Sequence, residues 1–457
     1  MMNAPAPHDG AVIGSGAMWT QRLVIIAAFA LGAGQPGCGD SLPAPREAKP
    51  DAPGAPDPAF TVGGIGGWYV VPSAAQQLDQ TMTVIVAAPA GTAFVDAWIA
   101  DLPVVRLSEQ PDGRFATQLS VEAVPSGAHQ VLLAADGATT AFAAVPFNRS
   151  APYYVLVTTD WDFADPGNPA NQYQDYLHDR HAELRMTHFV GPYTFTDPAV
   201  TEARRAELVA WLVQQRADHR DEIGLHIHPY CNFVTAAGLT CVTDQSTVYT
   251  EDLSGYTIKL GAYDRTQMGV LLDKSRALFE QYGLGTPRTF RAGGWTAELS
   301  TLQALADKDY VADTSALNWA RIEEWEGEEL YRWNMENWAP IGDTSQPYYP
   351  SATDVLTSAG PTLPLLEVPD NGVMIDYVTL PEMNGLFDAN WNREPLASPR
   401  TLMMGFHPAT PGFSEAEFLR VDGFLEYADM HLGSKHTGPV VYVTLEDVVA
   451  DFPAPAS

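Results

Sequence analysis

The sequence predicts an α/β fold, either a barrel or a wound parallel sheet, preceded by a small all-β module. Three patterns in the 457 residues support this prediction. Short alternating runs separated by turns occupy residues 59–149. From residue 150 to 453, longer apolar runs alternate with stretches of helical period, which is typical of strand–helix–strand units. Polar residues follow several of these apolar runs, at the strand ends where such folds bind ligands.

The composition allows a large core and excludes some partners. Hydrophobic residues make up 46% of the chain, and its length is enough for two or three domains. Lys and Arg number 25 against 56 Asp and Glu, which gives a formal net charge of −31. Such a surface repels the phosphates of nucleic acids and anionic lipid headgroups. We therefore expect no nucleic-acid partner, and membrane contact only through an N-terminal anchor.

Residues 1–38 have the features of a bacterial export signal. Arg22 precedes an apolar run over residues 23–34, which is shorter than the roughly 20 residues that span a bilayer but suits a signal-peptide core. Met18 is then an alternative start. The run leads into Gly37-Cys38, which resembles a lipobox, in which the cysteine is lipidated after cleavage. We expect a protein that is exported to the cell envelope and anchored through Cys38, or secreted.

A linker and two further cysteines fit this compartment. Residues 39–58 are rich in Pro, Ala and Asp, and predict a disordered linker. Cys231 and Cys241 lie ten residues apart, and an exported protein can oxidise them to a disulfide. Two buried free thiols are the alternative.

The first folded module is predicted as a small antiparallel sandwich over residues 59–149. Its expected strands are residues 82–87, 115–121, 129–134 and 140–145. Turn dipeptides such as Asp112-Gly113 and Asp136-Gly137 separate them. Residues 126–137 resemble a strand of bacterial immunoglobulin-like modules. We expect a spacer or a carbohydrate-contacting module, since no catalytic motif occurs here.

The second module, residues 150–453, alternates between strands and helices. The expected strands are residues 153–159, 185–190, 222–227, 289–291, 401–406 and 440–444, and the expected helices are residues 172–184, 201–219, 267–282 and 300–307. In a barrel or wound sheet built from such units, the residues that follow each strand converge at one face.

The residues at these strand ends carry acid–base and metal-binding chemistry. Asp160 and Asp162 end the first run, His226 and His228 end the third, and Arg291 and His407 lie in later runs. Side chains at i and i+2 of an extended chain point to the same face. Two imidazoles and one carboxylate therefore make a three-ligand set of the kind found in catalytic zinc sites. A second carboxylate can take a proton from water, with Arg291 orienting it and His407 as the acid.

Each of these residues also has a purely structural interpretation. An isolated pair of histidines is more often a satisfied surface or core pair, and an aspartate after a strand is commonly a helix N-cap. Together the four segments favour the metal site. His178, Asp179 and His181 also resemble ligands, but their helix is amphipathic and we expect them on its solvated face.

Seven motifs resemble the polysaccharide deacetylase family, the NodB-homology domain of carbohydrate esterase family 4. In chain order they are VLVTTDWD (155–162), MTHFVG (186–191), DEIGLHIHP (221–229), PRTFRAGGW (287–295), DYVADTSALN (309–318), LMMGFHP (402–408) and VVYVTLEDV (440–448). The resemblance covers residues 153–451. It implies a distorted (β/α) barrel that hydrolyses N- or O-acetyl groups of sugars with a divalent metal ion.

The resemblance also implies roles for individual residues. Asp160 would be the general base, Arg291 its partner and His407 the general acid. The metal would be held by Asp162, His226 and His228. Trp161, Trp295 and Asp313 lie within the motifs and are expected to contact substrate.

Two departures from the family pattern bear on the site. Trp161 separates two aspartates that are usually adjacent, which leaves two assignments open: Asp160 as base and Asp162 as ligand, or the reverse. The histidines are two residues apart rather than four, as in a divergent branch of the superfamily. We expect this spacing to alter the pocket more than the chemistry.

Residues 318–349 form an aromatic and acidic segment unlike a barrel strand or helix. It contains Trp319, Trp325, Trp333, Trp338, Tyr348 and Tyr349. Aromatic faces suit stacking on sugar rings, so this segment is either a substrate-binding lid or a loop packed on the barrel.

The sequence thus predicts an exported, metal-dependent carbohydrate deacetylase with one metal ion per chain, most simply Zn²⁺, and an acetylated carbohydrate as substrate. Two alternatives remain open: a metal-dependent amidohydrolase acting on a non-sugar amide, and a non-catalytic glycan-binding surface lipoprotein. The oligomeric state is not determined by these patterns.

Overall fold

The computed structural model describes residues 44, 48–248, 252–408 and 415–454. The predicted export signal, the alternative start at Met18 and the anchor residue Cys38 lie outside the described residues. Within the described part of the chain, no helix is long and apolar enough to cross a bilayer.

The N-terminal module consists of two sheets that share one core. The first sheet has the order β1 (Thr61–Gly63), β3 (Thr81–Ala87), β7 (Phe115–Ser120) and β6 (Ser108–Glu109). The second has the order β2 (Trp68–Val70), β9 (Ala143–Ser150), β8 (Gly127–Ala135), β4 (Val95–Ile99) and β5 (Val105–Arg106). All pairs are antiparallel except β2 with β9. Val84, Phe115, Val95 and Val131 pack between the sheets, as alternation predicts for a two-sheet module.

Part of the predicted linker is bound to this module. The backbone N–H of Asp51 donates to the carbonyl of Thr139 at 2.9 Å, and Ala141 N–H donates to the carbonyl of Asp51 at 2.8 Å. The Lys49 ammonium donates to Asp101 at 2.9 Å. Part of residues 48–58, which the sequence analysis assigned to the linker, therefore makes backbone and side-chain hydrogen bonds with neighbouring segments.

The second module is a curled parallel sheet. Its strands are β10 (Tyr153–Asp160), β11 (Met186–Val190), β12 (Glu222–Ile227), β13 (Thr289–Ala292), β14 (Ala312–Asp313), β15 (Leu366–Glu367), β16 (Arg400–Phe406) and β17 (Val440–Tyr442). The order is β15-β14-β13-β12-β11-β10-β16, and β17 also pairs with β10. The segment that follows β15 runs beside β16. Gly372 N–H of this segment donates to Met403 O of β16, and Ile375 N–H donates to Gly405 O, both at 2.8 Å. These bonds link the two ends of the sheet into a ring.

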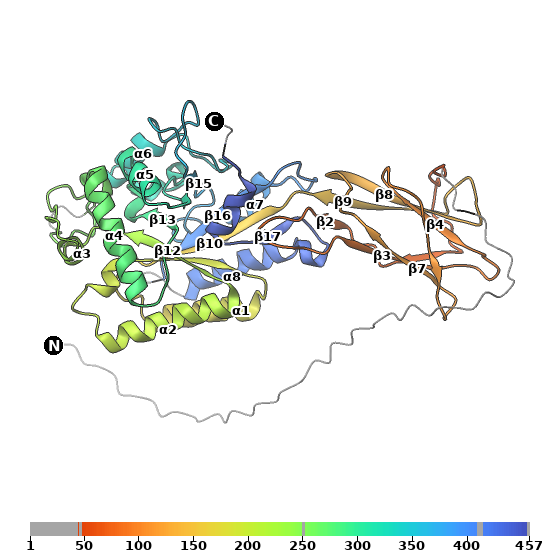
Figure 1. Cartoon of the computed structure of the whole chain (residues 1–457), viewed down its shortest axis with the longest axis horizontal. Helices are drawn as coiled ribbons and strands as arrows, with labels where there is room; N and C mark the ends of the chain where they lie inside the picture. The colour runs from red at the N-terminus through yellow and green to blue at the C-terminus, as the bar shows by residue number, and fades with distance from the viewer. Residues whose placement is uncertain (1–43, 45–47, 249–251, 409–414, 455–457) are drawn as a thin grey trace, which may run out of the picture. The chain divides into compact units, whose positions relative to one another are not determined.

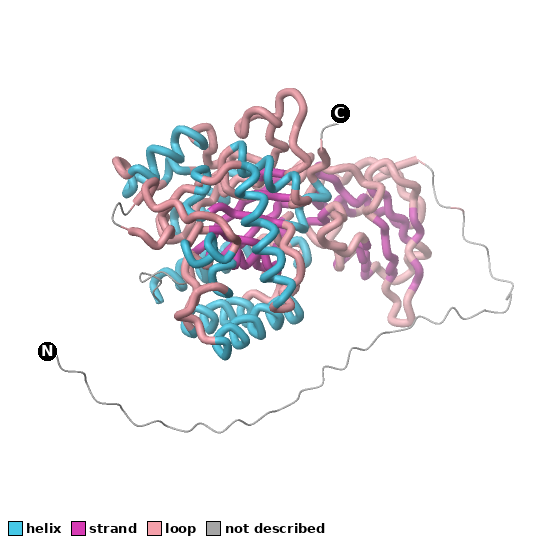
Figure 2. The backbone as a smooth tube through the Cα atoms, turned by 60° about the vertical axis from the view of Figure 1, so that its left-hand side comes forward, coloured by secondary structure: helices cyan, strands magenta, loops and turns pink. Residues whose placement is uncertain are grey.

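Helices cover the outside of this ring, as Figures 1 and 2 show. They are α1 (Asn168–Arg180), α2 (Glu202–His219), α3 (Cys231–Ala236), α4 (Arg265–Gln281), α5 (Leu299–Asp307), α6 (Glu329–Trp338), α7 (Leu380–Asn390), α8 (Glu415–Asp429) and α9 (Leu445–Val448). Local signals set several of their starts. Thr201 caps α2 by accepting from Arg204 N–H, and Asp264 forms a capping box with Gln267 at α4.

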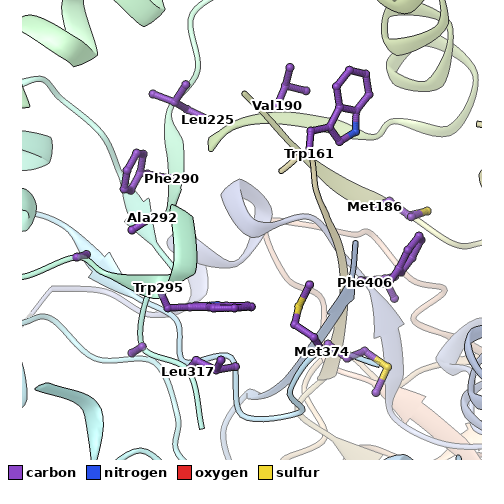
Figure 3. Close-up of a cluster of buried hydrophobic side chains, with 14 of the residues drawn as sticks. Trp161, Met186, Val190, Leu225, Phe290, Ala292, Trp295, Leu317, Met374 and Phe406 are labelled. Carbon is purple, nitrogen blue, oxygen red and sulfur yellow. The ribbon is translucent and has the colours of Figure 1, made fainter. Parts of the chain in front are cut away.

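The core lies on both faces of the sheet. All eight residues of β10 are buried, which explains why its sequence is a continuous apolar run rather than an alternating one. Leu225, Phe290 and Ala292 from neighbouring strands belong to one large cluster of buried apolar side chains, which also includes Met374 from the segment that closes the ring (Figure 3). The predicted strands and helices of this module were thus confirmed to within a few residues.

The prediction that His178 and His181 lie on a solvated face of the first helix was wrong. His178 and His181 are both buried, whereas Asp179 is exposed. His178 Nε2 and His188 Nε2 each lie 2.9 Å from Asp221 Oδ2, and His181 lies between Asp422 and Asp429 at 3.1 and 3.0 Å. The acidic partners are far away in the sequence, so the helix pattern alone did not reveal them.

Asp221 is the centre of a buried charge network, and its pKa yields a pH prediction. Burial alone would raise this pKa, but hydrogen bonds with His178 and His188 lower it to about 2. Because the folded pKa lies below the ordinary value, the stabilisation is complete above pH 4 and is lost as the pH falls toward 2. We expect Asp221→Asn to lower the free energy of unfolding by about 2 kcal/mol at pH 7.

Urea unfolding of the wild type and Asp221→Asn at pH 7 and pH 3 checks this prediction. The difference between their free energies of unfolding should be smaller at pH 3. Asp179→Asn, on the exposed side of the same helix, should change the free energy of unfolding by less than about 0.5 kcal/mol. An equal loss for Asp221→Asn at both pH values would show that charge plays no part.

Candidate active site

The end of β10 delivers two carboxylates to one cavity. Asp160 is the last residue of the strand and is 1% exposed, and Asp162 is 7% exposed. Both line a cavity of about 410 Å³. The extended chain turns the intervening Trp161 to the opposite side, where it is fully buried in the hydrophobic core. The alternation predicted from the sequence therefore holds at this strand end.

The end of β12 places two imidazoles against Asp162. His226 Nε2 and His228 Nε2 lie 3.2 and 3.3 Å from Asp162 Oδ1. The other ring nitrogens face backbone carbonyls: His226 Nδ1 lies 3.0 Å from Arg291 O, and His228 Nδ1 lies 2.8 Å from Tyr256 O. A carbonyl only accepts, so each Nδ1 carries a proton, and Nε2 is the ring atom that each histidine presents to Asp162.

This arrangement fits a divalent cation. Asp162, His226 and His228 each offer a ligand atom, and these atoms lie within 4.8 Å of one another. Two Nε2 atoms and a carboxylate oxygen that converge in this way can share a positive ion placed among them. Two imidazoles and a carboxylate match the ligands that zinc and neighbouring transition metals prefer, and leave coordination positions for water or substrate. The carbonyl partners of both Nδ1 atoms fix the ligating tautomer, as in known metal sites.

Arg291 holds the second carboxylate in place. Its side chain is fully buried, and Nη1 donates to Asp160 Oδ1 at 2.9 Å and to Thr158 Oγ1 at 2.8 Å. Nη2 lies 3.2 Å from Asp370 Oδ2, in the segment that closes the ring. Asp160 Oδ2 has no hydrogen-bond partner among the described residues. Asp160 thus keeps one carboxylate oxygen uncommitted at the cavity.

His407 lies across the cavity, just after β16. Its Nε2 is 3.8 Å from Asp162 Oδ1, and its Nδ1 is 3.0 Å from Asp376 Oδ2. Burial would lower the pKa of His407, but the carboxylates of Asp162 and Asp376 outweigh it and raise the pKa to about 10. A protonated imidazole with one nitrogen oriented by a carboxylate is suited to donating a proton.

Two further segments, the second of which runs into α6, form part of the cavity walls together with Trp295. The first contributes Thr247, Val248, Tyr256, Thr257 and Ile258, and the second contributes Trp325 and Leu330. A backbone hydrogen bond joins them, from Leu330 N–H to Thr247 O at 2.9 Å. Trp338 Nε1 also donates to Trp295 O at 3.1 Å, which ties α6 to the loop after β13. The walls are therefore mainly aromatic and aliphatic, and the acid–base and ligand groups lie at the base.

The aromatic segment 318–349 is largely packed onto the barrel. Trp319, Trp333 and Trp338 are buried in the core, and only Trp325 of its tryptophans lines the cavity. Most of this segment is therefore packed on the barrel, with Trp325 as the exception, but residues 329–338 form the helix α6 rather than a loop.

Two residues expected to contact substrate do not line the cavity. Trp161 lies behind β10 near Trp211, well apart from Trp295 in Figure 3. Asp313 is fully buried in β14, where Ser315 Oγ donates to it at 2.9 Å and burial raises its pKa to about 6. Membership of a motif did not indicate which side of the strand each residue faces. Trp295 does line the cavity.

Some residues of the site were not predicted from the sequence. Tyr256 OH donates to Asp162 Oδ2 at 2.7 Å, and Asp376 and Asp370 pair with His407 and Arg291. For Asp370 and Asp376 a weak signal exists, since both follow the apolar run before residue 370. For Tyr256 the sequence offers only the preceding Gly255, which is not specific.

A disulfide lies in the chain before the first wall segment. Cys231 and Cys241 are bonded, with their Cα atoms 5.1 Å apart, at the start of α3. Cys231 N–H also donates to Ser254 O at 2.7 Å. The cysteine pair thus lies at the base of the segment that carries Tyr256.

Comparison with known proteins finds likeness only among solved structures. The sequence matches no protein-family model and no curated protein. A family 4 carbohydrate esterase from Streptomyces lividans, solved with acetate, aligns at 10% identity and a TM-score of 0.33 over 66% of this chain and 98% of that one. A family 4 acetyl xylan esterase from Clostridium thermocellum, solved with a cobalt ion, aligns at 11% identity and a TM-score of 0.33 over 66% and 93%.

A third similar structure is that of an enzyme with a different activity. The 4-alpha-glucanotransferase from Thermococcus litoralis aligns at 8% identity and a TM-score of 0.36, over 66% of this chain and 40% of that one. At these identities and TM-scores the likeness concerns the outline of the fold, and the chemistry follows from the side chains above.

Arg291 gives a prediction for stability. Arg291→Met removes the charge that faces two buried carboxylates, Asp160 and Asp370, so we expect the free energy of unfolding to fall by about 3 kcal/mol or more in urea titrations. Adding Asp160→Asn should recover part of this loss. Arg265→Met removes an exposed ion pair with Asp307 and should cost less than about 1 kcal/mol. A loss for Arg291→Met as small as that of Arg265→Met would contradict the prediction.

Proposed function

We propose that this chain is a metal-dependent deacetylase that hydrolyses N- or O-acetyl groups of a carbohydrate, with one divalent ion, most simply Zn²⁺, per chain. One observation carries the proposal: three ligand atoms converge at the base of a cavity that an uncommitted oxygen of Asp160 and the imidazole of His407 also face. The same groups agree with the roles that the motif resemblance implies.

The residues divide the reaction between them. A divalent ion held by Asp162, His226 and His228 would supply an acidified water and polarise the acyl carbonyl. Asp160 Oδ2 accepts the proton of the attacking water, and Arg291 orients Asp160 through its hydrogen bond to Oδ1. His407, oriented by Asp376, donates a proton to the departing amine or alcohol. Water adds to the carbonyl carbon, the C–N or C–O bond breaks, and acetate and the free sugar group result.

The cavity favours a short substrate or a chain end. The ligand and acid–base groups are each at most 7% exposed, so the acetyl group must enter the cavity to reach them. Trp295, Trp325 and Tyr377 offer aromatic faces that suit stacking on a sugar ring. We infer an acetylated mono- or oligosaccharide, or the end of a polysaccharide, rather than the interior of a polymer.

A second candidate is a metal-dependent amidohydrolase acting on a non-sugar amide. The observation that favours it is the aliphatic part of the wall, Val248, Ile258 and Leu330, which a sugar does not need. The two candidates share the same metal chemistry and differ in the group attached to the acyl carbonyl.

The N-terminal sequence leads us to propose that the protein acts outside the cytoplasm. From the sequence we propose export, with Cys38 as a lipid anchor, and an immunoglobulin-like spacer for the two-sheet module. A glycan-binding lipoprotein without turnover is the non-enzymatic alternative.

The decisive experiment compares metal content and acetate release in three forms of the purified protein. The wild type should contain about one metal ion per chain and release acetate from acetylated chitooligosaccharides. His226→Ala/His228→Ala should lose both. Asp160→Asn should keep the metal and lose acetate release by roughly 10²- to 10⁴-fold, since it removes only the base.

Other outcomes redirect or reject the proposal. If the wild type contains metal but releases acetate only from small aromatic acetamides, the amidohydrolase would be favoured. Metal without turnover on either substrate would contradict the deacetylase. A folded wild type that takes up no ion after addition of Zn²⁺ would reject the metal mechanism and leave the glycan-binding alternative.

A further inference from the structure

Tyr256 contacts two of the three ligand residues at once. Its hydroxyl donates to Asp162 Oδ2 at 2.7 Å, and its backbone carbonyl lies 2.8 Å from His228 Nδ1. The Tyr256 ring also lies 4.6 Å from the ring of His228 between centroids. One residue therefore acts on the carboxylate through its side chain and on the imidazole through its main chain.

Each contact fixes a different property of the ligand set. The bond to Oδ2 leaves Oδ1 as the Asp162 oxygen that faces both imidazoles. Without that bond the carboxylate would be free to turn, because the terminal torsion of an aspartate has only a broad preference. The carbonyl keeps the proton on Nδ1 of His228, so that Nε2 remains the ligand atom.

The backbone around Tyr256 is built to hold it in this place. Gly255 has φ +90°, and a Cβ at that position would lie 2.4 Å from Pro229 O. Thr247 N–H donates to Thr257 O at 2.8 Å, which fixes the chain on the other side. The ring of Tyr230 stacks on that of Tyr256 with a centroid distance of 5.4 Å and an angle of 21°.

We infer that Tyr256 is a positioning residue that sets the affinity and ligand geometry of the metal site, by holding Asp162 to one oxygen and His228 to one tautomer. The inference rests on the metal site of the proposed function and adds a residue outside every motif that predicted the site. Loss of a group that orients a metal ligand typically weakens metal binding by 10- to 100-fold.

The test is metal affinity, measured apart from turnover. The full-length protein is stripped of metal, and Zn²⁺ and Co²⁺ dissociation constants are measured by competition with a chromophoric chelator. We expect Tyr256→Phe to raise the dissociation constants by 10- to 100-fold. The visible spectrum of the Co²⁺ form should also change, since the freed carboxylate alters the ligand geometry.

Tyr230→Phe is the matched control. The Tyr230 hydroxyl donates at 3.0 Å to the main-chain carbonyl of Asp162 rather than to its carboxylate. The same chemical change there should alter the dissociation constant by less than about threefold, below the range for a lost ligand-orienting group. Gly255→Ala is a second variant that shifts the backbone of residue 256 while keeping the hydroxyl, and it should also weaken binding. Near-ultraviolet circular dichroism of each metal-free variant checks that it is folded.

The outcomes separate this inference from the proposed function. A folded Tyr256→Phe protein that binds both metals as tightly as the wild type would overturn the role of Tyr256 and leave the deacetylase proposal intact. Weaker binding in Tyr256→Phe, with no acetate release from the wild type, would support the positioning role and reject the deacetylase. No metal uptake by the wild type would overturn both.

Discussion

The site depends on one buried cation. The Arg291 guanidinium contacts Asp160 on β10 and Asp370 on the segment that closes the ring, and its own carbonyl accepts from His226 on β12. A single residue of β13 therefore joins Asp160, the ring closure and His226. In a dry interior such a charge is costly unless it is fully paired, and the same cost makes the arrangement rigid. Movement of any one of these elements would leave a buried charge without a partner.

The balance of charge around this cation explains why the cavity suits a metal ion. Asp160, Asp162, Asp370 and Asp376 surround Arg291 and His407, so carboxylates outnumber the fixed positive charges. Burial already raises the pKa of Asp370 to about 6, which shows how poorly this interior tolerates another anion. A divalent ion beside Asp162 would offset the excess. His226 and His228 would then serve as ligands of that ion.

The sequence predicted the parts of this site that follow from strand periodicity. Asp160, Asp162, His226 and His228 lie at strand ends with i, i+2 spacing, and each pair reached the cavity as expected. The errors have two causes. Trp161 and Asp313 were assigned from motifs that do not specify which side of a strand a residue faces. His178 and His181 were placed in solvent because Asp221 and Asp422, their partners, come from elements far along the chain.

What the sequence could not supply are contacts made by irregular segments. Tyr256 and Asp376 lie in loops, and Trp325 ends a short 3-10 helix (Glu323–Trp325). The course of these segments depends on packing against the rest of the fold, and no apolar period marks them. The regular elements could be predicted because their apolar runs and caps are local properties. The cavity walls could not, since they depend on long-range hydrogen bonds such as that between Leu330 and Thr247.

The close spacing of the two histidines and the position of Tyr256 have a common structural reason. His226 lies within β12 opposite Arg291 of β13, so a neighbouring strand supplies the carbonyl for its Nδ1. His228 lies one residue beyond the end of β12, where no strand neighbour is paired with it. Its Nδ1 needs an acceptor from elsewhere, and the segment after α3 supplies one through Tyr256 O. A ligand pair two residues apart thus places its second histidine past the sheet, and a returning loop must take over the role that the sheet plays for the first.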